Sequence, residues 1–146
     1  MTAKFLPYDP GPLPTKPRPP RGTKIVLELE GLPPRKEISR SLRNPTHPNY
    51  RAFLNLRAAA IAAMDRRAWS RGLVRLSVTL RCPSPPGGAR MNEYLGGIAD
   101  SLDGSHGFTF TYLPVAFEDD CQVAQATSSF EPASEPSYVL EIEFLE

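Results

Sequence analysis

The chain has 146 residues, 40% of them hydrophobic, which suits one domain with a buried core. Only two cysteines are present, Cys82 and Cys121, so a disulfide framework is excluded and a reducing compartment is expected. No apolar run approaches the ~20 residues that cross a bilayer, and the proline-rich, polar opening differs from a signal peptide. We therefore expect a cytoplasmic protein with no membrane attachment.

Positive and negative charges are separated along the chain, although the net charge is only +1. All 17 Lys and Arg lie in residues 1–90 beside 5 acids, whereas residues 91–146 hold 11 acids and no Lys or Arg. The two parts therefore carry about +12 and −11. A nuclease needs this combination, because cations hold phosphates and carboxylates hold a metal. The alternative is that the two parts only attract each other within the fold.

The chain opens with residues 1–22, whose seven prolines predict a flexible, extended tail in front of a domain over residues 23–146. A strand is predicted over Lys24–Glu30 from its alternating apolar residues, and Gly31–Pro34 ends it. The following loop is basic and would contact phosphates if the chain binds nucleic acid. Its cations are Arg35, Lys36, Arg40 and Arg43.

A helix is predicted from Pro48 to about Arg67, because proline suits a first turn and five of the six residues 58–63 are alanine. Its predicted inward residues are Tyr50, Leu54, Ile61 and Met64. The arginines predicted to decorate this helix and its end are Arg51, Arg57, Arg66, Arg67 and Arg71. We expect Arg66 and Arg67 to contact a DNA backbone, the alternative being an ordinary polar helix face.

Strands are also predicted over Leu73–Arg81, Phe108–Tyr112 and Tyr138–Phe144, from alternating side chains, and a further strand over Cys121–Phe130. A second helix is predicted between the first two of these segments. The order β-α-β-α-β-β of the main elements implies an α+β fold in which two helices pack on a mixed sheet.

The second helix is predicted within Met91–Leu102, where apolar residues recur at spacings of three and four. Glu93 and Asp100 share its other face, with Gly96 and Gly97 between them. Glycine costs about 1 kcal/mol against alanine inside a helix, so we expect another part of the backbone to approach closely there.

Three acids follow one another at Glu118, Asp119 and Asp120. Adjacent carboxylates repel each other unless solvent or a cation relieves the repulsion. A divalent metal is one such cation.

These acidic stretches resemble the RusA-like Holliday-junction resolvases. The resemblance rests on a helix that ends in Asp-x-Leu, on the run Tyr94–Asp100, and on Asp-Asp-x-Gln-Val at Asp119–Val123. It is specific over Arg90–Val123, and by element order it extends over Lys24–Glu146. It implies a RusA-like fold and a homodimeric, magnesium-dependent endonuclease that cuts four-way DNA junctions.

This sequence departs from the family pattern at the start of the helix. The family helix opens with Asp-x-Asp-Asn and carries a lysine one turn on, whereas those places here hold Arg90, Asn92, Glu93 and Gly96. Glu93 is the acid that would substitute from the adjacent position, although one residue turns a helical side chain by about 100°.

The sequence therefore predicts a structure-selective DNA endonuclease of recombination and repair that hydrolyses phosphodiesters with Mg²⁺ or Mn²⁺. The predicted metal-binding and catalytic residues are Glu93, Asp100, Asp119 and Asp120. The predicted DNA-binding residues are Arg35, Lys36, Arg40, Arg43, Arg66 and Arg67. Two alternatives stay open: a nucleic-acid-binding module that kept the fold without the chemistry, and a protein-interaction subunit.

Overall fold

The computed structural model describes residues 11–36, 41–104 and 113–146. Its strands are β1 (Lys24–Glu30), β2 (Val74–Cys82), β3 (Val123–Pro132) and β4 (Ser137–Phe144), and its helices are α1 (Tyr50–Met64), α2 (Gly88–Leu102) and the short 3-10 helix η2 (Asp120–Gln122). The predicted α+β order β-α-β-α-β-β, with two helices and a mixed sheet, is confirmed. The strand predicted over Phe108–Tyr112 lies outside the described residues.

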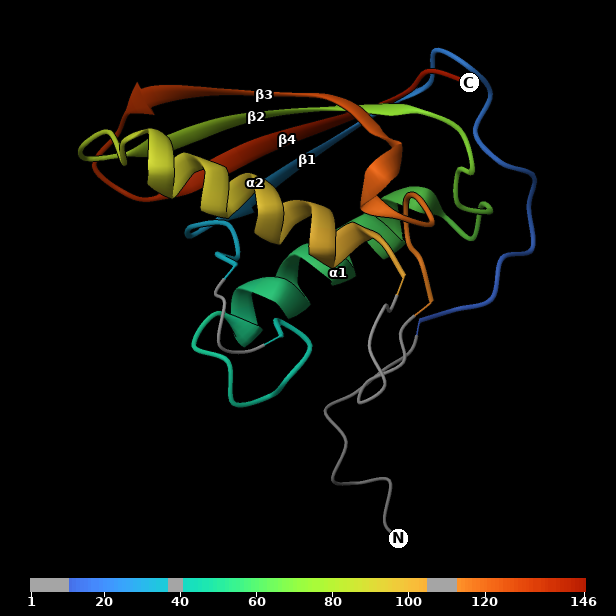
Figure 1. Cartoon of the computed structure of the whole chain (residues 1–146), viewed down its shortest axis with the longest axis horizontal. Coiled ribbons are helices and arrows are strands. Elements are labelled where there is room, and N and C mark those ends of the chain that lie inside the picture. The colour runs from blue at the N-terminus through green and yellow to red at the C-terminus, as the bar shows by residue number, and fades with distance from the viewer. Residues whose placement is uncertain (1–10, 37–40, 105–112) are drawn as a thin grey trace, which may run out of the picture.

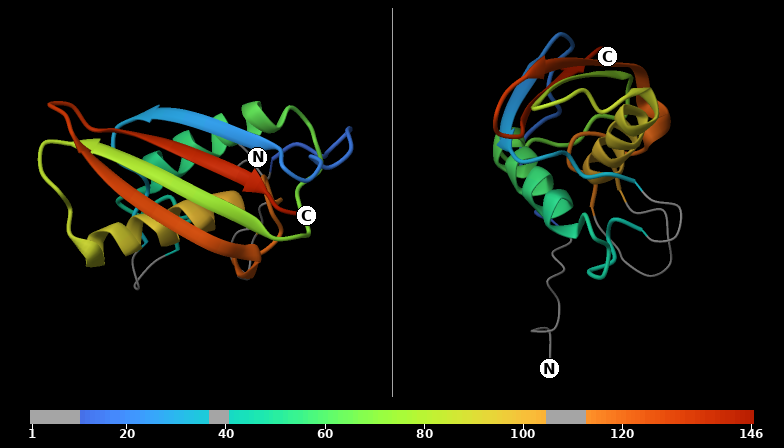
Figure 2. Two further views of the ribbon diagram at one scale, coloured as in Figure 1. Left: turned by 90° about the horizontal axis from the view of Figure 1, so that it is seen from above. Right: turned by 90° about the vertical axis from the view of Figure 1, so that its left-hand side faces the viewer.

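The four strands form one sheet in the order β1-β4-β2-β3. β4 runs antiparallel to both β1 and β2, and β2 runs parallel to β3, so β4 alone points the other way. Both α1 and α2 lie against the same face of this sheet (Figures 1 and 2). Within the described residues the fold is therefore a two-layer sandwich, in which both helices cover one face of the sheet and no helix covers the other.

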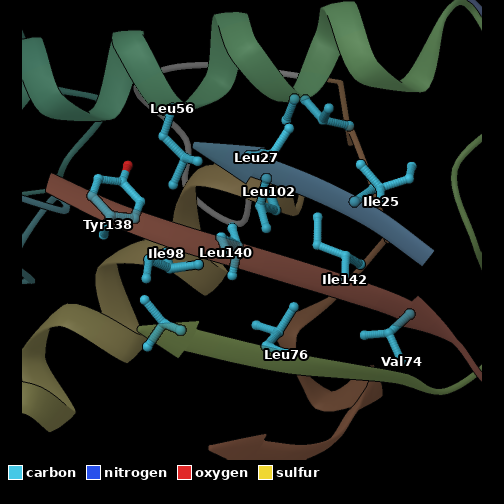
Figure 3. Packing of buried hydrophobic residues seen from close by; sticks show 14 of the residues in the cluster. Ile25, Leu27, Leu56, Val74, Leu76, Ile98, Leu102, Tyr138, Leu140 and Ile142 are labelled. Carbon is cyan, nitrogen blue, oxygen red and sulfur yellow. The ribbon is translucent and has the colours of Figure 1, made fainter. Parts of the chain in front are cut away.

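The core lies between the sheet and the two helices (Figure 3). Every second residue of β2 and β4 is buried, as their alternating sequences predict. The fully buried side chains of these two central strands include Val74, Leu76, Leu80, Leu140, Ile142 and Phe144. From α2 the core receives Tyr94, Ile98 and Leu102, whereas Met91 and Leu95 are only partly buried.

Helix α1 is shorter than predicted. It ends at Met64 because Asp65 and Arg66 both adopt left-handed backbone angles, with φ of 52° and 66°. Arg57, predicted on the outside, is 3% exposed on the inner face of the helix. No helix in the described parts of the chain is long and apolar enough to span a membrane.

Residues 11–22, which the sequence predicts to be part of a flexible tail, make defined contacts with the domain. This segment is extended, and its backbone pairs with the turn after α1: Thr15 and Lys16 N–H donate to the carbonyl of Arg66, and Ala68 N–H donates to Lys16. Gly22 N–H donates to the carbonyl of Phe144 in β4. The predicted domain boundary at residue 23 thus falls inside a segment that contacts the folded domain.

Candidate functional site

Three aspartates converge at the end of α2. One carboxylate oxygen from each of Asp100, Asp103 and Asp120 lies within 4.8 Å of the others. Asp103 is 0% exposed, Asp100 is half-buried, and Asp120 is exposed. The cluster therefore has a buried floor and an open side, which gives a cation from solvent access to its oxygens.

Two different elements supply these carboxylates. Asp100 belongs to the last turn of α2 and Asp103 follows that helix, and residues three apart lie on the same face of a helix. Asp120 begins η2, which leads directly into β3 at the edge of the sheet. The cluster therefore forms only when η2 is held beside the end of α2.

Gln122 holds η2 in this position. Its side-chain oxygen accepts hydrogen bonds from the N–H groups of Glu118 and Asp119, both at 2.8 Å. Its side-chain nitrogen donates to the carbonyl oxygens of Ser70 and Gly72, at 2.9 and 2.7 Å. These hydrogen bonds fix the turn Glu118–Asp120 to the segment that precedes β2, so the buried Gln122 side chain positions Asp120.

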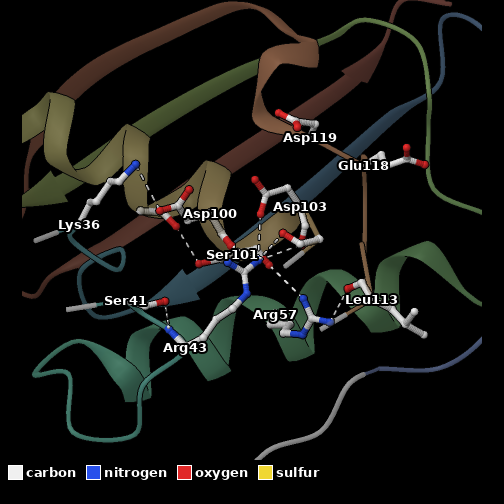
Figure 4. A network of polar contacts seen from close by, with 12 residues as sticks. Lys36, Ser41, Arg43, Arg57, Asp100, Ser101, Asp103, Leu113, Glu118 and Asp119 are labelled. Atoms are coloured by element: carbon white, nitrogen blue, oxygen red, sulfur yellow. Dashed lines mark hydrogen bonds and ion pairs between the residues drawn. The ribbon is translucent and has the colours of Figure 1, made fainter. Parts of the chain in front are cut away.

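Arg43 lies beneath the end of α2 and is 7% exposed. Its Nη2 atom donates to the Asp103 carboxylate at 2.9 Å and to the carbonyl oxygens of Asp100, Asp103 and Gly104 at 2.7, 3.0 and 3.1 Å (Figure 4). A cation at a helix C-terminus satisfies the last carbonyl groups and interacts favourably with the helix dipole. Arg43 therefore orients Asp103 and closes α2 from inside the protein.

A second buried arginine completes this polar layer. Arg57 of α1 donates from Nη2 to the carbonyl of Leu113 at 2.6 Å, and from Nη1 to that of Ser101 at 3.4 Å (Figure 4). The Ser101 hydroxyl in turn donates to the carbonyl of Gly97 at 2.7 Å. Two arginines that belong to the basic part of the sequence thus support the acidic part from within the fold.

The carboxylates on the open side of the cluster repel one another, and a bound cation would relieve that repulsion. The pKa of Asp120 is raised, first by partial desolvation of its carboxyl group, although the residue as a whole is exposed, and then by Asp119 and Asp100, while Lys36 lowers it. The hydrogen bond with Asp119, followed by burial, raises the pKa of the Cys121 thiol. A protonated thiol is a poor nucleophile, so the chemistry of this region belongs to its carboxylates.

The structure brings together only two of the four predicted metal-binding residues. Glu93 lies seven residues before Asp100, about 10 Å along the helix axis, and forms ion pairs with Arg35 at 3.6 Å and Arg90 at 3.2 Å. Asp119 caps η2, where one of its carboxylate oxygens accepts from the N–H of Cys121 at 2.9 Å. Neither belongs to the group of three oxygens that converge.

Asp103 is the member of the cluster that sequence reasoning missed. Its position three residues after Asp100 was the available signal, because that spacing places two carboxylates side by side at a helix end. The sequence could thus have indicated Asp103, the most deeply buried acid of the site, but it gave no sign that Arg43 is its buried partner.

The predicted DNA-binding residues are dispersed. Arg35 and Lys36 lie beside α2, whereas Arg43 is buried below it. Arg66 and Arg67 lie beyond the end of α1, where Arg66 donates to the carbonyl of Leu13 and Arg67 to those of Met64 and Ala63. The remaining one, Arg40, lies outside the described residues. The predicted cation that reaches the aspartates from solvent is therefore Lys36, whereas the half-buried Arg35 pairs with Glu93.

Gly96 and Gly97 of α2 leave space for the chain that follows β1 to pack against the helix. A Cβ atom on Gly97 would overlap the carbonyl oxygen of Pro34, and one on Gly96 would lie 3.2 Å from Cδ of Lys36. The close backbone approach that the sequence predicted is thus confirmed.

No protein-family model matches this chain, and no curated protein matches it.

Proposed function

We propose that this chain is a divalent-metal-dependent endonuclease that acts on branched DNA, in the manner of the RusA-like resolvases that its acidic stretches resemble. The observation that carries the proposal is the convergence of Asp100, Asp103 and Asp120 within 4.8 Å. The mixed sheet and the element order agree with the layout expected from that resemblance.

The three carboxylates fit Mg²⁺ or Mn²⁺ by chemistry and by spacing. Hard divalent cations take oxygen ligands, and Mg²⁺ in particular is bound by a few carboxylates together with water and phosphate oxygens. Asp103 is oriented by Arg43, as ligating carboxylates commonly are by surrounding hydrogen bonds. A metal ion held here would polarise a phosphoryl oxygen and lower the pKa of a bound water.

Three half-exposed cations along α2, of which Lys36 reaches the aspartates, would hold the DNA. Arg35, Lys36 and Arg90 flank the outward face of α2, and their side chains are 32%, 54% and 47% exposed. Such residues contact phosphate oxygens and position a DNA strand without reading its sequence. The DNA backbone would thus pass over α2, with the phosphate to be cut above Asp100 and Asp120.

The proposal includes a homodimer, as expected of a resolvase that cuts a four-way junction. Strand β3 supports it: of the described strands, β3 pairs only with β2, and eight of its ten residues are exposed. Natural edge strands are usually blunted by charges, but Glu131 is the only charged residue of β3. A second copy that pairs with this edge would cover it. A cytoplasmic location is proposed with it, since both cysteines are free thiols.

The test is cleavage of a four-way DNA junction with Mg²⁺ or Mn²⁺, compared with Asp120→Asn and with Asp65→Asn as matched control. Asp65 is an exposed aspartate whose partner is Lys16, away from the cluster. We expect the wild type and Asp65→Asn to cut the junction and Asp120→Asn to lose the activity. Mg²⁺ should also raise the melting temperature of the wild type and not that of Asp120→Asn, because ligand binding to the folded state stabilises it by mass action.

Two further results would decide between the proposal and its alternatives. A wild type that binds junctions with an affinity that falls as salt rises, yet ignores Mg²⁺ and never cuts, would be a nucleic-acid-binding module. A wild type that binds no junction even at low salt would leave the acids as part of a protein-interaction surface.

A further inference from the structure

The chain after β1 is fixed against α2 at three points. Gly97 makes room for the carbonyl of Pro34, and the N–H of Lys36 donates to the carbonyl of Glu93 at 3.2 Å. The aliphatic stem of Lys36 then crosses the bare backbone of Gly96, with Cδ 3.2 Å from the place of a Cβ on that glycine. The start of the Lys36 side chain is therefore held by the backbone of α2.

The end of this side chain reaches the aspartate cluster. Lys36 Nζ lies 3.4 Å from Oδ2 of Asp100, and Figure 4 shows it approaching from the opposite side to Arg43. The Lys36 side chain is 54% exposed, whereas the Arg43 side chain is 8% exposed and donates through Nη2 to Asp103 and to carbonyl oxygens at the end of the helix. Between Lys36 and Arg43, the cations that the described residues bring to the cluster, Lys36 is thus the one that a ligand from solvent can meet.

We infer that Lys36 is a further catalytic residue of the proposed nuclease, whose ammonium group binds a non-bridging oxygen of the phosphate that is cut. The inference rests on the proposed function and adds a residue to its site. In the reaction, water adds to phosphorus and loses a proton to solvent, and the bond from phosphorus to one sugar oxygen breaks as that oxygen takes up a proton. Lys36 forms and breaks no covalent bond.

The contribution of Lys36 is electrostatic. Negative charge accumulates on the phosphoryl oxygens as water adds, and a cation that is already in place stabilises this charge more than it stabilises the ground state. Asp100 holds the ammonium next to the position of the phosphate before the DNA arrives. Water screens the ion pair on the side of the half-exposed Lys36, so the pair with the half-buried Asp100 adds little to stability by itself.

The test is a single-turnover cleavage assay on a four-way junction at saturating Mg²⁺, with junction affinity measured separately in Ca²⁺. Lys36→Ala should slow cleavage about 100-fold, the usual loss for one stabilising donor, and weaken binding less than about threefold. Lys16→Ala is the matched control, because Lys16 is also a half-exposed lysine paired with an aspartate, Asp65, but lies away from the cluster. It should leave the cleavage rate of bound DNA within about threefold of wild type.

A relocated lysine provides the rescue. Residue 96 precedes Asp100 by one helical turn, so its side chain lies on the same face, and removing the Lys36 stem clears the space above it. The double variant Lys36→Ala/Gly96→Lys and the single variant Lys36→Arg should each cut at least about tenfold faster than Lys36→Ala.

Several outcomes would overturn the inference while leaving the nuclease intact. One is a wild type that cuts together with a Lys36→Ala variant that cuts equally fast. A rate loss fully explained by weaker junction binding would do the same, as would failure of both Lys36→Arg and the double variant to recover activity. A wild type that never cuts with Mg²⁺ or Mn²⁺ is a different result, because it removes the proposed function itself and the role of Lys36 with it.

Discussion

The two ends of α2 carry the same kinds of charged residues in different surroundings. At the first end, Glu93 pairs with Arg35 and Arg90, and all three side chains are about one third to one half exposed. At the other end, Asp103 pairs with Arg43 in an environment where both are almost fully buried. The ion pairs at the first end are solvated, and the pair at the second end forms part of the protein interior.

This difference determines what each end contributes. Exposed ion pairs are typically worth less than 1 kcal/mol, because water competes for both partners. In a buried pair each charge depends on the other, since neither can be solvated once the other is lost. We therefore expect substitutions at the end of α2 that holds Asp103 to change stability and the metal site, and those at the Glu93 end to change neither.

The largest effect is expected for Arg43→Met, which keeps the stem of the side chain and removes its charge. Asp103 and three carbonyl groups would lose their buried donor, at a cost of about 3–5 kcal/mol in the free energy of unfolding. Urea unfolding measures it. Arg35→Met is the control at the solvated end and should change stability by less than about 0.5 kcal/mol. Equal effects of the two substitutions would remove the distinction between the ends.

Gly97→Ala is expected to have the next largest effect. The new Cβ would overlap the carbonyl oxygen of Pro34, and a backbone atom cannot move aside as the end of a side chain can. We expect a loss of about 1–3 kcal/mol by urea unfolding. Gly96→Ala is the matched control, because its Cβ meets only the flexible stem of Lys36. A neutral Gly97→Ala would mean that the chain after β1 does not lie against α2 in this way.

Asp120→Asn should raise the metal-free stability at neutral pH by a small amount, about 1–2 °C in melting temperature. The raised pKa of Asp120 means that its charge is less favourable in the folded than in the unfolded protein. This penalty is complete above the folded-state pKa and disappears as the pH falls towards the ordinary value of 3.8. Melting curves of both proteins between pH 7 and pH 4 should therefore converge, and a gap that widens on acidification would contradict the prediction.

Glu93→Gln should have the smallest effect. Its side chain is 48% exposed and, among the described residues, pairs with two cations that are themselves partly solvated, so stability should stay within about 0.5 kcal/mol. The rise in melting temperature with Mg²⁺ should equal that of the wild type, because Glu93 is two turns away from Asp100. If the rise is lost instead, Glu93 belongs to the metal site, and the two ends of α2 act together.

The sequence predicted the elements and left two of their positions to be corrected. Alternation in β2 and β4 and the glycine pair in α2 depend on residues close to one another in the chain, so they are readable from the sequence. The end of α1 was placed three residues late, because left-handed angles at Asp65 and Arg66 carry no strong sequence signal. Residues 11–22 were assigned to a tail, since their contacts are backbone hydrogen bonds and the hydrogen bonds of Lys16 and Arg18 to residues about 50 positions later, which composition does not report.

The sequence by itself determined that acids gather in the second part of the chain and cations in the first. It also determined that Asp100 lies near the end of α2 and that Asp120 comes shortly before β3. Only the tertiary structure decided which of these charges meet. Arg43 and Asp103 are 60 residues apart, and Gln122 is 52 residues from the carbonyl of Ser70 that it binds. Such contacts depend on how two helices and a sheet pack together. An arginine looks the same in the sequence whether that packing buries it, as with Arg43, or leaves it partly in contact with water, as with Arg35.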